Sequence, residues 1–384
     1  MRAFLLPACL LATATATSLV RAQAAADGPG DTQEHVDGLH ADTERGGQLA
    51  KKGLSVVALP IPKSDPTLGA GLTLPVLLLY DPNPGSRPWM TGVGAMYTSS
   101  KSWAAGAFQK AYLFDNQLRL TASVGYADLH LDYYGTGAAA GSRGVSVPIR
   151  QRAPLAYVKA LWGVSPHLFA GLRYHHVTVD TSVQAFHLPG SDFTVPGFDR
   201  DVTVSAFGLA GEFDTRDSEL NPRRGSFASA SIDFPRDSTG STYDFNAGRL
   251  AVNHYLALDT TRTVAMRASL CATSGDVPYF SLCQFGSQGD LRGYETGRYR
   301  DRALFATQAE YRWRFHARWG AVVFGGVGGV ASQVKETLAG SLLPSAGLGV
   351  RWQASTTYDM NLAADMAWGR DGARGFYLRI GEAF

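Results

Sequence analysis

Between Thr357 and Gly369 the side chains alternate in polarity at every second position, and this alternation constrains the fold of the chain more than any other feature. One parity, that is, one set of every second position, consists of Tyr358, Met360, Leu362, Ala364, Met366 and Trp368. The other holds Asp359, Asn361, Ala363, Asp365, Ala367 and Gly369. Successive side chains point to opposite faces along a β-strand. The segment is therefore predicted to be a strand with one apolar face and one polar or small face.

The polar parity of this and neighbouring segments carries many charges. Extending the same alternation over 305–314, 346–353 and 376–384 predicts an inward set of Glu310, Arg312, Arg314, Arg351, Asp359, Asp365 and Arg379. The core of a soluble β-sandwich or barrel, the alternative, cannot hold so many charges without large desolvation costs. A water-filled lumen can hold them, so the apolar parity is predicted to face lipid. Tyr358 and Trp368 lie ten residues apart, which at a tilt of about 40° spans roughly the 25 Å between the aromatic girdles of an outer-membrane barrel.

The whole chain reads as such strands, and it is predicted to be all-β, a sixteen-stranded antiparallel transmembrane β-barrel. The strand centres are predicted near Val57, Leu74, Gly94, Gly106, Val124, Tyr157, Leu172, Phe207, Ala230, Gly248, Met266, Glu310, Val323, Leu348, Ala363 and Arg379. Long loops at 134–150, 180–201, 274–299 and 331–340 fall on one side, as in barrels whose external loops are long and periplasmic turns short. The alternation flips near Ala127 and Gly248, where we expect β-bulges.

The N-terminal part of the chain predicts export. Residues 1–24 read as a cleaved signal peptide ending in Ala22-Gln23-Ala24, 25–52 as a disordered periplasmic linker, and 53–384 as the barrel domain. Removal of Arg2 and Arg21 with the signal leaves 33 basic and 33 acidic residues, a balance that gives no reason to expect a nucleic-acid partner. The predicted location is the bacterial outer membrane, with its lipid as the surrounding partner.

Three short motifs, in order along the chain, carry a family resemblance. They are the turn Asp214-Thr215-Arg216-Asp217 with Asn221-Pro222-Arg223-Arg224-Gly225, the loop Leu291-Arg292-Gly293-Tyr294, and the end Ile380-Gly381-Glu382-Ala383-Phe384. From Gly53 onward the chain resembles the BamA/TamA-like outer-membrane assembly superfamily, the bacterial surface antigens. Members usually carry periplasmic POTRA domains. Only 25–52 stand between the predicted signal and the first strand, too few for a folded domain of typical size. The chain is thus expected to be a barrel-only member.

The resemblance implies that the loop around Arg292 folds back into the lumen and is held there. Glu310 faces inward on the next strand and is the expected carboxylate partner of Arg292. Gly293 would permit close backbone approach, and Tyr294 would pin the loop. The family pattern has a second acidic partner on the thirteenth strand, where this chain has Gly326. Glu310 is therefore expected to be the single acidic anchor.

Two further sets of residues follow from the predicted topology. The seam between the first and last strands would involve Leu54, Pro60, Gly381 and Phe384, because proline cannot donate a ladder hydrogen bond and a glycine would let the last strand kink. The periplasmic turn would contain Asp214, Arg216, Asp217 and Arg223. Cys271 and Cys283 flank the start of the long loop, either as a disulfide or as two free thiols.

No arrangement of residues predicts catalysis, a cofactor or a metal site, so the chain is predicted not to be an enzyme. The resemblance implies an insertion or translocation factor that acts through a weak seam on unfolded β-barrel or translocated protein substrates. Two alternatives remain. The chain is a passive pore plugged by its long loop, or it is a scaffold whose periplasmic or lipoprotein partner replaces the POTRA domains.

Overall fold

The computed structural model describes residues 55–58, 60–80, 82, 89–183, 186–187, 194–195, 198–218, 221–286, 290–338, 340, 342–355 and 360–384. The predicted signal peptide, the predicted linker, Leu54, Tyr358 and Asp359 lie outside the described residues. Within them, no helix is long and apolar enough to cross a membrane.

Strands make up most of the described chain. The long strands are β3 (Gly69–Tyr80), β4 (Trp89–Thr98), β5 (Trp103–Leu113), β6 (Leu118–Tyr133), β7 (Val147–Ser165), β8 (Leu168–Val183), β11 (Phe198–Asp214), β12 (Gly225–Pro235), β13 (Phe245–Ala257), β14 (Arg262–Gly275), β17 (Ala303–Trp313), β18 (Trp319–Ala331), β19 (Leu343–Ser355), β20 (Met360–Gly369) and β21 (Arg374–Ile380). The short ones are β1 (Ser55–Ala58), β2 (Ile61–Asp65), β9 (Phe186–His187), β10 (Thr194–Val195), β15 (Cys283–Gln284) and β16 (Arg300–Asp301). The helical elements are α4 (Ala138–Arg143), η2 (Asp237–Thr239), η3 (Tyr279–Ser281) and η4 (Val334–Glu336).

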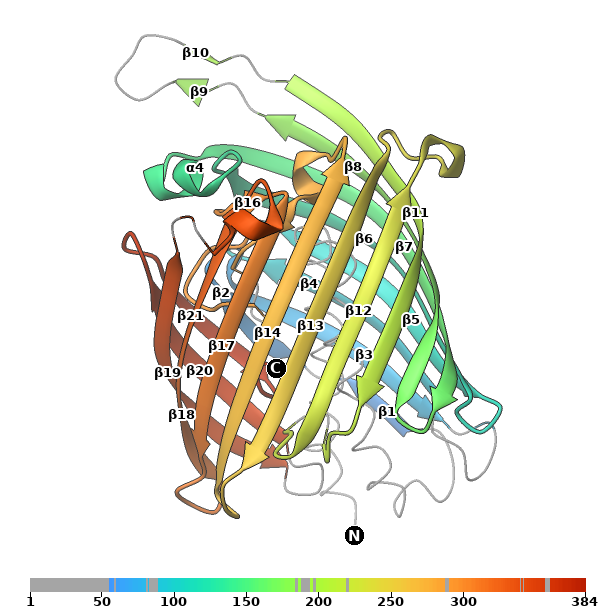
Figure 1. The fold of residues 1–384 in the computed structure, drawn as a ribbon, viewed down its shortest axis with the longest axis vertical. Helices are drawn as coiled ribbons and strands as arrows, with labels where there is room; N and C mark the ends of the chain where they lie inside the picture. Colours follow the sequence, from blue (N-terminus) through green and yellow to red (C-terminus); the bar gives the residue numbers. More distant parts are fainter. Residues whose placement is uncertain are drawn as a thin grey trace.

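One antiparallel sheet contains seventeen of these described strands, and from β3 to β21 each strand of the sheet pairs with the next one along the chain (Figure 1). β1 and β2 both pair with β3, at Val76–Leu79 and at Gly69–Thr73. The two segments thus lie one after the other along the same edge of β3, with a break around Pro60, and together they fill one strand position in the sheet. The strand predicted around Val57 is therefore continued by a second segment, β2, which the sequence did not indicate. β2 also pairs with β21, at Ser64 and Leu378.

The two faces of this sheet have the polarity that the alternation predicts. Large apolar side chains are exposed on one face, such as Val323, Leu348 and Trp368, at 55%, 53% and 46% of their surface. The opposite parity is buried and charged, at Glu310, Arg312, Arg351, Asp365 and Arg379. A soluble β-protein buries its apolar parity instead. One expected member of the charged set is placed differently, because Arg314 lies in the exposed turn after β17 and donates to the Thr260 carbonyl at 3.1 Å.

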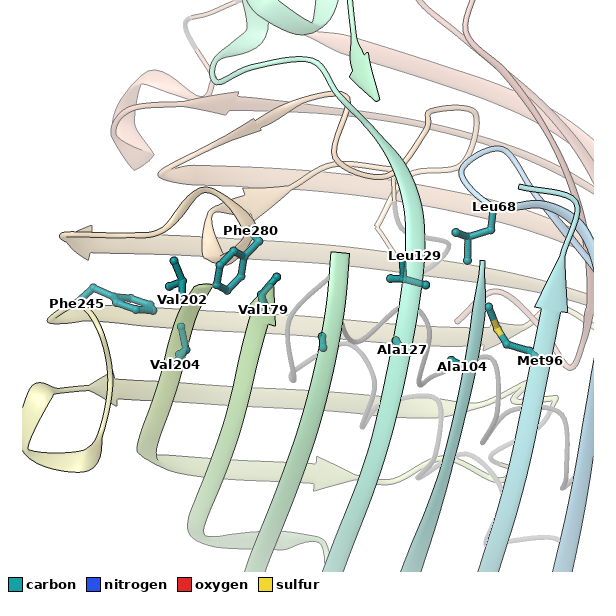
Figure 2. Packing of buried hydrophobic residues seen from close by; sticks show 11 residues of the cluster. Leu68, Met96, Ala104, Ala127, Leu129, Val179, Val202, Val204, Phe245 and Phe280 are labelled. Atoms are coloured by element: carbon teal, nitrogen blue, oxygen red, sulfur yellow. The ribbon is translucent and has the colours of Figure 1, made fainter. Parts of the chain in front are cut away.

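Towards the long-loop end, the buried face becomes apolar. Met96, Ala104, Ala127, Leu129, Ala153, Val179, Val202 and Val204 line several adjacent strands there and pack with Leu68, Phe245 and Phe280 (Figure 2).

The expected bulges near Ala127 and Gly248 are absent from this described part of the sheet. The pairing of β6 runs without a register shift through Ala127, and the pairing of β13 runs without one through Gly248. The hydrophobicity pattern flips because Ala127 and Leu129 face the apolar layer, as do Phe245 and Ala247. The register shifts lie elsewhere, between Gly163 and Ser165 and between Gln353 and Ser355.

Candidate functional site

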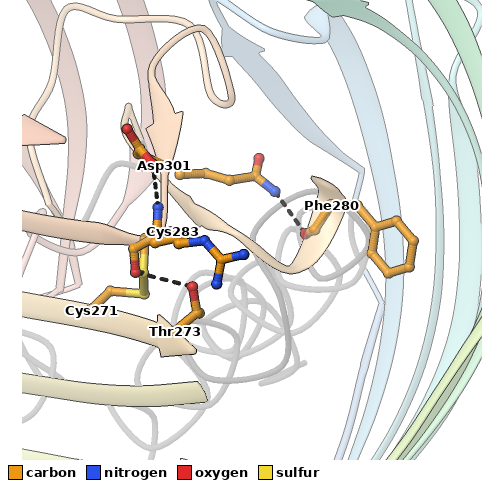
Figure 3. Close-up of a disulfide and its surroundings, with 7 residues drawn as sticks. Cys271, Thr273, Phe280, Cys283 and Asp301 are labelled. Carbon is orange, nitrogen blue, oxygen red and sulfur yellow. Dashed lines mark hydrogen bonds between the residues drawn. A yellow bond between two sulfur atoms is a disulfide. The ribbon is translucent and has the colours of Figure 1, made fainter. Parts of the chain in front are cut away.

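The loop that contains Arg292 begins and ends in the two-stranded pairing of β15 with β16, at Cys283–Asp301 and Gln284–Arg300. A disulfide joins Cys283 to Cys271 on β14 (Figure 3). The Thr273 hydroxyl also donates to the Arg302 carbonyl, at 3.0 Å. Both contacts fix the base of the loop to the wall of the sheet.

Arg292 is completely buried within the described residues. Its guanidinium forms ion pairs with Glu310 on β17 and with Asp365 on β20. It also donates twice to the side-chain oxygen of Gln308, at 3.2 Å each. The guanidinium carbon lies 3.4 Å from the ring centroid of Phe324, a cation–π contact. Planar and multidentate pairing of this kind is what an arginine provides and a lysine does not.

A wider network surrounds this pair of carboxylates. Asp365 also accepts from Arg351 and Arg379, and Glu310 accepts from Arg312 at 2.9 Å. The third carboxylate is Glu382, which accepts from Arg351 and from the Asn361 amide, both at 2.8 Å. Burial raises the pKa of Glu382, but Arg351 and Arg312 lower it by more, to about 2. Four arginines and three carboxylates thus connect the loop to β17, β19, β20, β21 and the segment after β21.

The expectation that Glu310 is the single acidic anchor is wrong, because Asp365 is the second. It comes from β20 rather than from the expected position on β18. Gly326 on β18 has no room for a side chain, since an added Cβ would lie 2.4 Å from the Thr307 carbonyl and 2.6 Å from Leu291. Leu291, itself buried, occupies the space in which an aspartate would stand.

Gly293 and Tyr294 complete the attachment of the loop. Gly293 has a φ of 109°, and its N–H donates to the Tyr377 hydroxyl at 2.8 Å. The Tyr294 hydroxyl donates to the Pro344 carbonyl and accepts from the Arg370 N–H at 2.9 Å. The Tyr294 ring also lies against Gly369, where an added Cβ would come within 2.5 Å of it.

The edges of the sheet meet over a very short length. Within the described residues, β2 and β21 are paired in register only at Ser64 and Leu378, whereas β20 pairs with β21 from Leu362–Ile380 to Trp368–Arg374. Of the predicted seam residues, Pro60 is exposed and follows β1, and Gly381 has a φ of 77° directly after β21. The carbonyl of Phe384 accepts from Arg312 at 2.8 Å.

The predicted turn residues form local contacts between β11 and β12. Asp214 forms an ion pair with Arg216 at 2.8 Å. Asp217 accepts from the backbone N–H of Arg223 at 2.9 Å. Arg223 reaches the next turn, where it donates to the Asp259 carbonyl. The turn is therefore braced internally and against its neighbour.

Comparison with known proteins agrees with this architecture. Residues 87–384 match the Omp85 superfamily domain. The chain belongs to the Omp85 superfamily. Its fold is similar to that of BamA from Haemophilus ducreyi lacking POTRA domains 1–3, with a TM-score of 0.58 and 12% identity over 85% of this chain and 70% of that one.

Two further solved structures are similar, CdiB from Acinetobacter baumannii and CdiB from Escherichia coli. The first has a TM-score of 0.52 and 12% identity, over 85% of this chain and 59% of that one. The second has a TM-score of 0.56 and 10% identity, over 88% and 68%. No curated protein matches by sequence. The family and its neighbours indicate an Omp85-type outer-membrane β-barrel.

Several residues of the site were not assigned roles from the sequence. The inward parity of Asp365 was predicted, but parity alone did not connect it to Arg292, which lies 73 residues away along the chain. Gln308 and Phe324 share the parity of Glu310 in their strand pair, which is the signal that could have found them. Among the described residues, no group of three or more His, Cys, Asp or Glu side chains is placed to bind a metal ion.

Proposed function

We propose that this protein is an outer-membrane insertion or translocation factor for proteins, and that it acts through the junction between β2 and β21. The proposal carries over to this chain the role expected of an Omp85-type barrel. The observation that supports it most directly is that, among the described residues, the first and last positions of the sheet meet in register at a single pair, Ser64 with Leu378.

The barrel itself is proposed to be closed and sixteen-stranded, with the Arg292 loop inside its lumen. The shared position of β1 and β2 beside β3 supports the count, since seventeen strands then occupy sixteen positions. The pairing of β2 with β21 supports closure. The complete burial of Arg292 among inward-facing carboxylates supports the luminal place of the loop.

The seam would open with little loss of backbone hydrogen bonding, because within the described residues its two edges are in register at one residue pair. Unpaired strand edges template the pairing of further strands. An unfolded substrate strand would then add to β21 or to β2, while the ion-pair network holds the segment after β21 in place. Gly381 supplies the backbone freedom for β21 to bend away from β2.

A loop-plugged passive pore is the second candidate, favoured by the disulfide at the base of the loop. A scaffold for a periplasmic or lipoprotein partner is the third, and co-purification of such a partner would support it. Purified protein in liposomes distinguishes the first two. The insertion proposal predicts faster folding of a urea-denatured outer-membrane barrel than in empty liposomes. If the protein is instead a loop-plugged passive pore, no acceleration is expected, and deletion of segment 286–298 should produce a large steady conductance.

A further inference from the structure

An apolar cavity of about 690 Å³ lies at the long-loop end of the molecule, away from the Arg292 network. Its wall is formed by Val147 and Ile149 of β7, Val183 of β8 and Val202 of β11. Val277 and Pro278, in the segment after β14, line its other side. Its volume is within the range of small-molecule sites, about 300–1,000 Å³.

The strand residues of this wall, within the described part of the chain, are already paired with neighbouring strands. Val147 is paired with Tyr133, and Ile149 with Val183. On the next strand pair, Val202 is in register with Val179. A bound peptide segment would therefore have to bury its own N–H and C=O groups without partners, at a cost of about 1–3 kcal/mol for each group. A hydrocarbon chain has no such groups to satisfy.

Two polar side chains of the lining, Thr181 and Tyr279, are within hydrogen-bond distance of each other, and Gln151 behind the lining also contacts Tyr279. The Tyr279 hydroxyl accepts from the Gln151 amide at 2.6 Å and is 2.8 Å from the Thr181 hydroxyl. Its ring meets that of Tyr133 edge to face, with centroids 5.2 Å apart. The hydroxyl groups of Thr181 and Tyr279 thus have partners, and the cavity surface is mainly apolar.

Charge is confined to exposed lining residues, and it is positive on balance. Arg200 and Arg302 are exposed, as is Asp276, the one carboxylate among the described lining residues. The Arg200 guanidinium donates to the Tyr243 hydroxyl, and Arg302 donates to the Gly275 carbonyl at 2.9 Å. Within the described residues, each guanidinium makes this hydrogen bond through one of its two terminal nitrogens, and a guanidinium has further donors that can pair with an anion.

We propose that this cavity binds the acyl chain of an anionic amphiphile, whose carboxylate or phosphate group lies against Arg200 and Arg302. The acyl chain displaces water from the apolar wall, and this burial of apolar surface supplies most of the affinity. The two guanidinium groups select an anionic end over a neutral one. A free fatty acid and an acidic lipid share this chemistry.

The test uses the full-length protein in phosphatidylcholine nanodiscs, with three photoreactive probes that carry a diazirine at the end of the acyl chain. One is a fatty acid, the second the corresponding fatty alcohol, and the third a phosphatidic acid. Peptide mapping after illumination is expected to find the fatty acid on 133–149 and 276–281. Labelling by phosphatidic acid at the same peptides would assign the site to a lipid, and its absence would assign the site to a free acid.

Variants separate the cavity from the surrounding bilayer. Val277→Trp fills the cavity and should abolish labelling there, whereas Leu172→Trp, on the 60% exposed lipid-facing side, should leave it unchanged. Arg200→Gln and Arg302→Gln should each lower labelling by the acid up to about fivefold and leave the alcohol unaffected. Heat-modifiable mobility confirms that each variant is folded. If the label is spread over outward-facing positions and is unchanged by Val277→Trp, the cavity is not the binding site. If the acid and the alcohol label equally, the two arginines do not select an anionic group.

Discussion

Asp365, on the penultimate strand β20, forms a buried ion pair with Arg292, in the loop that starts at the disulfide to β14. This contact joins β20, which lies next to the last strand of the sheet, to a loop that is distant from it in the sequence. The loop and the C-terminal edge of the sheet therefore share one electrostatic network, and a change in either is expected to affect the other.

Replacement of Asp365 by asparagine should destabilise the protein strongly. Arg292, Arg351 and Arg379 would lose a shared carboxylate that is completely buried, and breaking a buried pair from one side costs about 3–5 kcal/mol. The free energy of unfolding in urea, followed by tryptophan fluorescence, measures the loss. Asp180→Asn is the matched control, because its partner Arg152 is 42% exposed, and a loss below about 1 kcal/mol is expected there. Equal losses would contradict the account.

Gly326→Ala should weaken docking of the loop, since even a methyl group would meet Thr307 and Leu291 at less than van der Waals distance. A destabilisation of about 1–3 kcal/mol is expected. Gly325→Ala, next to it in β18, is the control, because its Cβ would find only the Ser345 carbonyl at 3.6 Å. Proteolysis at 285–300 should become faster in the first variant alone. Similar protection in both would show that Leu291 does not depend on the space at Gly326.

Gly293→Ala and Gly372→Ala provide a comparison of two glycines with positive φ. Both have a positive φ, at 109° and 73°. A Cβ added to Gly293 would lie 3.1 Å from the Trp368 backbone, whereas a Cβ added to Gly372 would have nothing within 4 Å. The first substitution should therefore cost about 1–3 kcal/mol more than the second. Urea unfolding measures both. A smaller effect at Gly293 would mean that the loop has freedom to move away from β20.

Acidification should remove the contribution of Glu382. Its pKa is lowered from an ordinary value of 4.5 to about 2, so its stabilising effect is complete above the ordinary value and is lost as the pH falls through the lowered one. The difference in melting temperature between the wild type and Glu382→Gln should thus be largest near neutral pH and shrink towards pH ~2. A difference that does not depend on pH would show that the carboxylate charge plays no part.

The strands could be predicted from the sequence because lipid and water impose opposite polarities on alternate side chains. Each of the sixteen predicted strand centres lies within a strand, including Val57 in β1 and Arg379 in β21. The pattern failed at Ala127 and Gly248, where the buried face is itself apolar, and polarity no longer reports which way a side chain points.

Contacts between segments distant in the sequence were harder to predict from the sequence. Parity placed Glu310 and Asp365 on the inner face, but the partner of each depends on where the loop lies, and no local pattern specifies that. The continuation of the first strand into β2 was also missed, since Pro60 reads as a terminator. The structure instead resumes pairing with β3 at Ile61.

Cross-linking of the seam tests the central claim most directly. Ser64→Cys with Leu378→Cys would bridge the in-register pair that joins β2 to β21 in the described structure. Ala95→Cys with Ala105→Cys would bridge an ordinary pair of β4 and β5. Both proteins are oxidised in liposomes and assayed for faster folding of a denatured outer-membrane barrel. We predict that the seam cross-link abolishes the acceleration, that reductant restores it, and that the control cross-link has no effect. Full acceleration with the seam closed would contradict the proposed mechanism.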